Sequence, residues 1–122
     1  MYLFNKGDIS YVTKGCPKQQ PKKFNWIFPQ PRIFKYAVRC CSISDIPGTC
    51  ISKDPQANNG GACLGKHTYD GALKVCKDKG MRMCQKAELD THCCGTGCYD
   101  AEWVWVTDQG KLCLNGEKGN RI

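Results

Sequence analysis

The sequence predicts a small, disulfide-rich α+β domain with two short helices and antiparallel strands, preceded by an extended N-terminal arm. Eleven cysteines among 122 residues indicate a scaffold held by disulfides, because a chain of this size buries only a modest core. Apolar residues recur at helical spacing after Thr68, and residues 103–106 form an apolar run typical of a strand. A single domain accounts for this length.

The cysteines are expected to pair with one another, because the chain has no C-x-x-C motif of the kind that binds zinc. Zinc held by cysteine with His67 or His92 is the less favoured alternative, and no metal or other cofactor is expected. Disulfides persist in oxidising surroundings, which predicts an extracellular or cell-surface protein or, alternatively, a virion component. The disulfide candidates are Cys40, Cys41, Cys50, Cys63, Cys76, Cys84, Cys93, Cys94, Cys98 and Cys113.

An odd number of cysteines leaves one thiol without an intramolecular partner. Cys16 precedes the others by many positions, so it is a candidate for a free thiol or for a bridge to another chain. Alternatively, Cys16 ties the arm to the domain and the odd thiol lies elsewhere. The sequence does not distinguish these two roles.

Residues 1–36 are predicted to form a basic arm, and residues 37–122 a cysteine-rich domain. The first 39 residues hold eight basic side chains against one acidic, which equals the net charge of +7 of the whole chain. Four of the six prolines also lie there, and proline favours extended backbone over helix. Such an arm suits docking onto neighbouring protein subunits, with lysines steering and aromatic rings anchoring. The candidate partner-binding residues are Lys18, Lys22, Lys23, Phe24, Trp26 and Phe28.

Three alternatives to this docking arm remain open. Its lysines would equally suit an anionic polysaccharide or a membrane surface. Its aromatic rings could pack on the arm's own domain, as large aromatics usually do. Cations beside stacking rings also suit single-stranded nucleic acid, but the arm lacks a recognised motif, so nucleic acid is not an expected partner. No stretch approaches 18 apolar residues, and no membrane span is expected.

Within the cysteine-rich part, a helix is predicted between Thr68, a good N-cap, and Gly80, which favours a helix end. A second, shorter helix is predicted at residues 86–92. Residues 36–41 are predicted as a short strand, and residues 103–106 as a strand that forms a hairpin with residues 111–114. The expected buried face of the first helix is Tyr69, Ala72, Leu73 and Cys76.

Several of these segments resemble the C-type-lectin-like superfamily, over about residues 37–115. The resemblance rests on Cys63, Thr68–Cys76, Gly80–Cys84, Ala87–Leu89 and Trp103–Trp105, which match its two cysteine-flanked helices and its tryptophan-bearing strand. It implies two helices packed against small antiparallel sheets, and either ligand binding through loops or an architectural role. The sugar-binding motifs of the calcium-dependent members are absent from this chain.

No group of residues points to catalysis. Asp100 and Glu102 could form a carboxylate pair, but such side chains are usually solvated. We therefore expect a non-enzymatic structural or interaction module of an external assembly, such as a virion, coat, matrix or appendage, that docks to neighbouring subunits through its arm. The alternative is an extracellular lectin-like domain that binds carbohydrate through Trp103 and the loop around residues 58–60.

Overall fold

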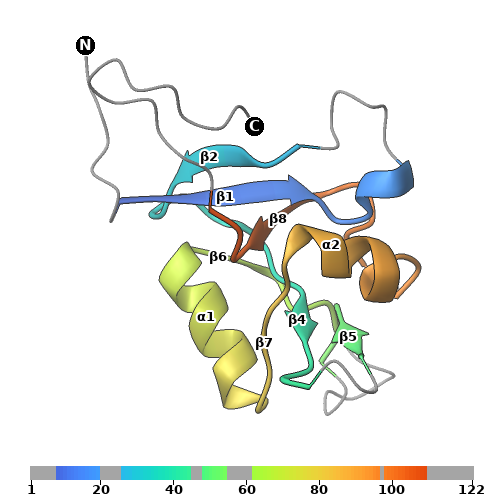
Figure 1. The fold of residues 1–122 in the computed structure, drawn as a ribbon. Coiled ribbons are helices and arrows are strands. Elements are labelled where there is room, and N and C mark those ends of the chain that lie inside the picture. Colours follow the sequence, from blue (N-terminus) through green and yellow to red (C-terminus); the bar gives the residue numbers. More distant parts are fainter. Residues whose placement is uncertain (1–7, 20–25, 45–47, 55–61, 97, 110–122) are drawn as a thin grey trace.

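The computed structural model describes residues 8–19, 26–44, 48–54, 62–96 and 98–109, and Figure 1 shows its fold. Its larger sheet has five strands in the order β2-β1-β8-β3-β6. Neighbouring strands are antiparallel except β3 and β8, which run parallel, whereas the sequence predicted antiparallel strands alone. The strands are β1 (Ile9–Lys14), β2 (Phe28–Pro31), β3 (Tyr36–Ala37), β6 (Lys66–His67) and β8 (Trp103–Val106).

A smaller sheet has the order β5-β4-β7, and each of its strands is two residues long. They are β4 (Cys40–Cys41), β5 (Cys50–Ile51) and β7 (Arg82–Met83), all antiparallel. The single strand predicted at residues 36–41 is thus divided between two sheets, since β3 belongs to one and β4 to the other. Strands this short have little stability of their own and depend on crosslinks and packing.

The first helix, α1 (Tyr69–Asp78), begins where the sequence predicts. The hydroxyl of Thr68 accepts a hydrogen bond from the backbone N–H of Gly71 (3.2 Å), as an N-cap should. Gly80, just beyond the helix, has a φ of +69°, a conformation that glycine adopts without strain. Leu73 is 40% exposed, so its predicted place on the buried face is wrong; the buried stripe is narrower. That stripe consists of Tyr69, Ala72 and Cys76.

The second helix also lies where the sequence predicts, as α2 (Lys86–Glu88) continued by a π-helical turn, η4 (Leu89–Cys93). Pro17–Gln19 form a 3-10 turn, η2, where the prolines predicted extended backbone. A fixed φ suits proline to the first position of a helical turn, so one proline can begin a turn instead of preventing it. The backbone N–H of Lys18 donates to the Asp90 carboxylate (2.8 Å), which ties η2 to η4.

The five-stranded sheet is covered on both faces. Side chains alternate along β1, so successive residues belong to the apolar clusters on opposite faces. Tyr11 belongs to an apolar cluster with Leu89 of η4, and Val12 belongs to a second cluster with residues of α1. Trp105 of β8 is fully buried in the second cluster. Its indole N–H donates to the carbonyl of His67 (2.8 Å), which satisfies the one polar group of the ring.

The N-terminal strands belong to this sheet, which corrects the expectation of an extended arm over residues 1–36. β1 is an inner strand, paired with β2 on one side and with β8 on the other. Strands from both sides of the predicted boundary at residues 36 and 37 therefore share one sheet. Five of the six β1 residues are buried, although the segment around this strand is rich in lysine and proline.

Five disulfides pair the ten described cysteines with one another. Cys16 is bonded to Cys94, so it has the tethering role and not the role of a free or intermolecular thiol. Cys113 lies outside the described residues. So many disulfides place the protein in an oxidising compartment. The pairs are Cys16–Cys94, Cys40–Cys76, Cys41–Cys84, Cys50–Cys93 and Cys63–Cys98.

Arg39 lies between the two sheets with its side chain fully buried. Its guanidinium donates to the backbone carbonyls of Gly15 and Cys98 and pairs with the Asp100 carboxylate at 2.7 Å. Burial lowers the pKa of Arg39, and the hydrogen bond to Asp100 opposes that shift. A buried cation bound by two separate segments fixes where the end of β1 meets residues 98–100. Within the described ranges, no helix has the length and apolar character needed to cross a membrane.

Candidate functional site

A groove of about 300 Å³ opens on the sheet face that also carries α1. Phe28 and Trp103 meet edge to face in it, with 5.3 Å between their ring centroids. This volume lies at the lower end of small-ligand sites, which span about 300–1,000 Å³, so the groove suits a single ring-sized group. The groove is lined by Val12, Phe28, Gln30, Tyr36 and Trp103.

The strand register brings these residues together from distant parts of the chain. Val12 of β1 is paired with Phe28 of β2, and Lys14 is paired with Trp103 of β8. Side chains of paired residues project from the same face of a sheet. Three strands therefore contribute adjacent rows to one surface, and Tyr36 of β3 adds a fourth element.

Polar groups in and beside the groove are few and specifically placed. The hydroxyl of Tyr36 donates to the side-chain oxygen of Gln30 (2.8 Å), and an amide engaged in this way still has N–H groups to offer a ligand. The ammonium of Lys14 lies 4.5 Å from the centre of the Trp103 ring and donates to the carbonyl of Ala101 (3.0 Å). The groove thus combines aromatic surface with one amide and one cation.

Large apolar side chains are exposed just before and just after β2 in the sequence. Trp26, two residues before the strand, is 54% exposed, and Ile33 and Phe34, just after it, are 79% and 50% exposed. Only two other large apolar residues of the described ranges are exposed, Ile43 and Leu73. Trp26 precedes β2 and the other two residues follow it, so these are exposed apolar side chains near one strand that a partner could cover.

The described members of the predicted partner-binding set, Lys18, Trp26 and Phe28, lie in separate places. Phe28 lines the groove and Trp26 is exposed nearby in the sequence. Lys18 is exposed on η2, beside η4, which packs on the opposite face of the sheet from the groove. The remaining predicted residues, Lys22, Lys23 and Phe24, lie outside the described residues, as does the loop at residues 58–60 that the carbohydrate alternative invoked.

Sequence reasoning identified Phe28 and Trp103 for two separate hypotheses and missed that they share one groove. It also missed Val12, Gln30 and Tyr36 as lining residues. Alternation of apolar and polar residues indicates which side chains share a face of one strand. It does not indicate which strands pair, and pairing is what assembles this groove.

The predicted carboxylate pair is accounted for by ion pairs. Asp100 binds Arg39 and accepts from the N–H of Gly95, and Glu102 lies 3.4 Å from the ammonium of Lys66. Each carboxylate therefore has a nearby cation, and these ion pairs give it a structural role.

A second, more open cleft of about 500 Å³ contains charges that neutralise one another. Arg82 and Glu88 make a bidentate pair across it, at 2.6 and 2.7 Å. The hydrogen bond from Arg82 lowers the pKa of Glu88 below its ordinary value, and burial opposes this shift. Because these groups satisfy each other, the aromatic groove is the stronger candidate for a binding site.

Comparison with protein-family models, with curated proteins and with solved structures finds no match to this chain, and no lectin fold among them matches it. The resemblance to the C-type-lectin-like superfamily therefore stays a prediction. The observations made on the molecule itself are its small α+β fold, its disulfides and its aromatic groove.

Proposed function

We propose that this protein is a non-enzymatic interaction module of an external assembly, such as a virion, coat, matrix or appendage, and that it docks onto neighbouring protein subunits. The observation that carries the proposal is the exposure of three large apolar side chains just before and just after β2, namely Trp26, Ile33 and Phe34. Aromatic residues are enriched in protein interfaces, where they supply large contact areas at low entropic cost.

The rest of the molecule supports docking in three ways. β2 is an edge strand that contains Pro29 and Pro31, so further strands cannot add along it without losing hydrogen bonds. Docking through β2 is therefore by side chains. Pairing of β2 with β1 keeps the strand between these side chains ordered, which lowers the entropic cost of association. A net charge of +7 favours an acidic partner surface through faster encounter.

The test compares two pairs of exposed apolar residues in the cells that build the assembly. Trp26→Ser with Phe34→Ser removes the surface beside β2, and Ile43→Ser with Leu73→Ser removes similar exposed residues elsewhere. We expect the first variant to fall at least tenfold in the purified assembly, as loss of interface anchors worth about 2 kcal/mol implies. The second variant should be incorporated like the wild type. Equal incorporation of both would contradict the proposal.

A second candidate, carbohydrate binding on the cell exterior, is favoured by the groove. Trp103 and Phe28 present aromatic surface for an apolar sugar face, and Gln30 supplies the hydrogen-bonding amide that would orient it. The resemblance to the C-type-lectin-like superfamily agrees with such a role.

A glycan array, with and without calcium, separates the two functions. A sugar-binding groove predicts selective binding that Gln30→Ala abolishes and that Trp26→Ser leaves intact. Subunit docking predicts no selective glycan and the reverse dependence on these two residues.

A further inference from the structure

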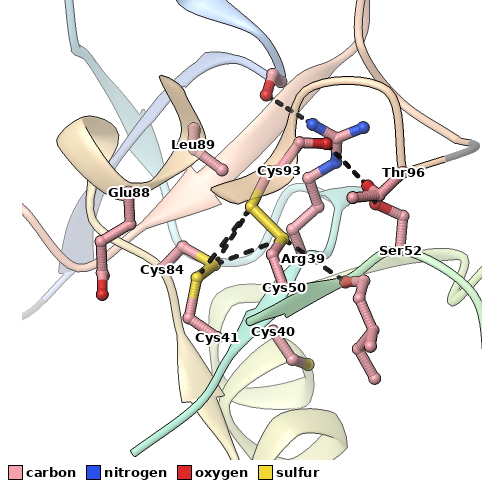
Figure 2. Close-up of a disulfide and its surroundings, with 12 residues drawn as sticks. Arg39, Cys40, Cys41, Cys50, Ser52, Cys84, Glu88, Leu89, Cys93 and Thr96 are labelled. Atoms are coloured by element: carbon pink, nitrogen blue, oxygen red, sulfur yellow. Dashed lines mark hydrogen bonds between the residues drawn. A yellow bond between two sulfur atoms is a disulfide. The ribbon is translucent and has the colours of Figure 1, made fainter. Parts of the chain in front are cut away.

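Two of the five disulfides, Cys41–Cys84 and Cys50–Cys93, lie directly against each other, as Figure 2 shows. The sulfur of Cys84 is 3.6 Å from that of Cys93 and 3.9 Å from that of Cys50. The sulfur of Cys41 is 4.0 Å from that of Cys93. All four sulfur atoms lie within 4.8 Å of one another, so they occupy one small volume.

Strand pairing and the end of η4 bring these four positions together, in addition to the sulfur–sulfur bonds. Cys41 and Cys50 are direct partners in the β4–β5 pairing, so their side chains are neighbours on one face. Cys84 follows β7, which is hydrogen-bonded to the other side of β4, and Cys93 ends η4. Because strands this short depend on crosslinks, a metal bound by the four thiols would take the place of the two opened bonds.

The spacing of the sulfur atoms matches a tetrahedral metal centre. A zinc ion with four cysteine ligands at about 2.3 Å has its sulfur atoms about 3.8 Å apart, which follows from the geometry of a tetrahedron. Three of the four distances between sulfurs of different disulfides, from 3.6 to 4.0 Å, already fall around this value, and the fourth, between Cys41 and Cys50, is at most 4.8 Å. Only the two bonded pairs would have to separate.

The surroundings also favour a metal in the reduced chain. Cys41, Cys84 and Cys93 are at most 1% exposed, among apolar neighbours that include Tyr11 and Leu89. Bare thiolates in such surroundings would be very costly, so reduced cysteines there either keep their protons or share a cation. One Zn²⁺ bound by the four thiolates offsets part of their negative charge, and the four ligands make a closed site of the structural type.

From this geometry we propose that the reduced form of the chain binds one Zn²⁺ through the thiolates of Cys41, Cys50, Cys84 and Cys93. Each disulfide takes two electrons and two protons from one dithiol reductant, which leaves as its own disulfide. The four thiols then give up four protons as the metal binds. Cys50 is the only half-buried member of the set, so reduction begins at the Cys50–Cys93 bond.

The reverse reaction is oxidation, and in it the zinc-bound form precedes the disulfide form. Two disulfide oxidants accept four electrons from the zinc tetrathiolate, which releases Zn²⁺ and forms the two native bonds, while the oxidants leave as four thiolates. Because every cysteine is made as a thiol, a zinc-bound stage would hold these four side chains in position before oxidation.

The test uses the full chain, reduced anaerobically with a phosphine and titrated with Co²⁺ as a spectroscopic probe for zinc. We expect one Co²⁺ per chain with the absorption of a tetrahedral tetrathiolate centre, displaced by Zn²⁺. X-ray absorption of the zinc-loaded chain should show four sulfur ligands at about 2.3 Å.

Two matched variants locate the site, since the reduced chain has other thiols. Cys50→Ala with Cys93→Ala removes two of the four ligands and should weaken metal binding at least a hundredfold. Cys63→Ala with Cys98→Ala removes one of the three disulfides outside the cluster, and this variant should bind the metal like the wild type. Absence of a tetrathiolate spectrum in the wild type would overturn the proposal. Equal weakening of both variants would overturn it too, because the metal would then lie elsewhere.

Discussion

The two sheets of this molecule are stabilised in different ways. None of the strands of the five-stranded sheet contains a cysteine, and long register pairings and the buried Trp105 hold the sheet together. The three-stranded sheet has strands of two residues, and three disulfides begin on them, at Cys40, Cys41 and Cys50. Where strands are too short for a hydrogen-bonded ladder, covalent bonds to α1 and to the segment after β7 replace it.

The difference explains how one small chain supports both a binding surface and a crosslinked base. The groove needs adjacent rows of side chains, and β1, β2 and β8 provide most of them. The disulfides fix the opposite part of the molecule, and Arg39 joins the two parts through Gly15 and Asp100. Four variants of the protein test this difference between the two sheets.

Removing residues 1–14 should have the largest effect, because it takes the inner strand β1 out of the five-stranded sheet. Tyr11 would be lost from one apolar cluster and Val12 from the other, and β8 would lose its pairing with β1. We expect no cooperative unfolding transition by circular dichroism. A chain that instead folded without β1 would restore the idea of a detachable arm; removing residues 1–7 alone is the matched control.

Removing one disulfide of the smaller sheet should cost less and act locally. Cys40→Ala with Cys76→Ala opens a loop of 36 residues between β4 and α1. Loop-closure entropy for this length predicts a loss of about 4 kcal/mol in the free energy of unfolding. Hydrogen exchange should accelerate first in β4, β7 and α1, with β1 and β8 the slowest to exchange. Uniform acceleration in both sheets would show that they are not separate units.

Part of this architecture is legible in the sequence, and the reason is locality. The N-cap at Thr68 and the cysteine density predicted α1 and the disulfide scaffold, since each depends on neighbouring residues or on composition. The inner position of β1, the partner of Cys16 and the groove between Phe28 and Trp103 depend on pairings across many residues. Charge and proline content suggested a separate arm because composition does not report strand pairing, whereas the burial of β1 depends on its pairing with β8.

Glu88→Gln should show a pH-dependent loss in the part of the molecule that contains α2 and β7. The hydrogen bond from Arg82 lowers the pKa of Glu88, so the ionised side chain stabilises the fold above the ordinary glutamate pKa. This contribution disappears as the pH falls through the lowered pKa. At neutral pH the variant should be about 1–2 kcal/mol less stable in urea unfolding, the usual worth of a hydrogen bond to a charged group. In strong acid the two proteins should unfold alike; a difference independent of pH would assign the effect to packing.

The smallest expected effect is that of Thr68→Ala, which tests whether α1 depends on its cap once Cys76 is bonded to Cys40. The hydroxyl of Thr68 satisfies the N–H of Gly71, and loss of such a cap typically costs about 1 kcal/mol. Thr68→Ser keeps the acceptor and should behave like the wild type. If the disulfide already holds the first turn in place, the cost of Thr68→Ala will be no larger than that of Thr68→Ser. A full cost of about 1 kcal/mol would show that the crosslink fixes the end of the helix near Cys76 and leaves its first turn to local hydrogen bonding.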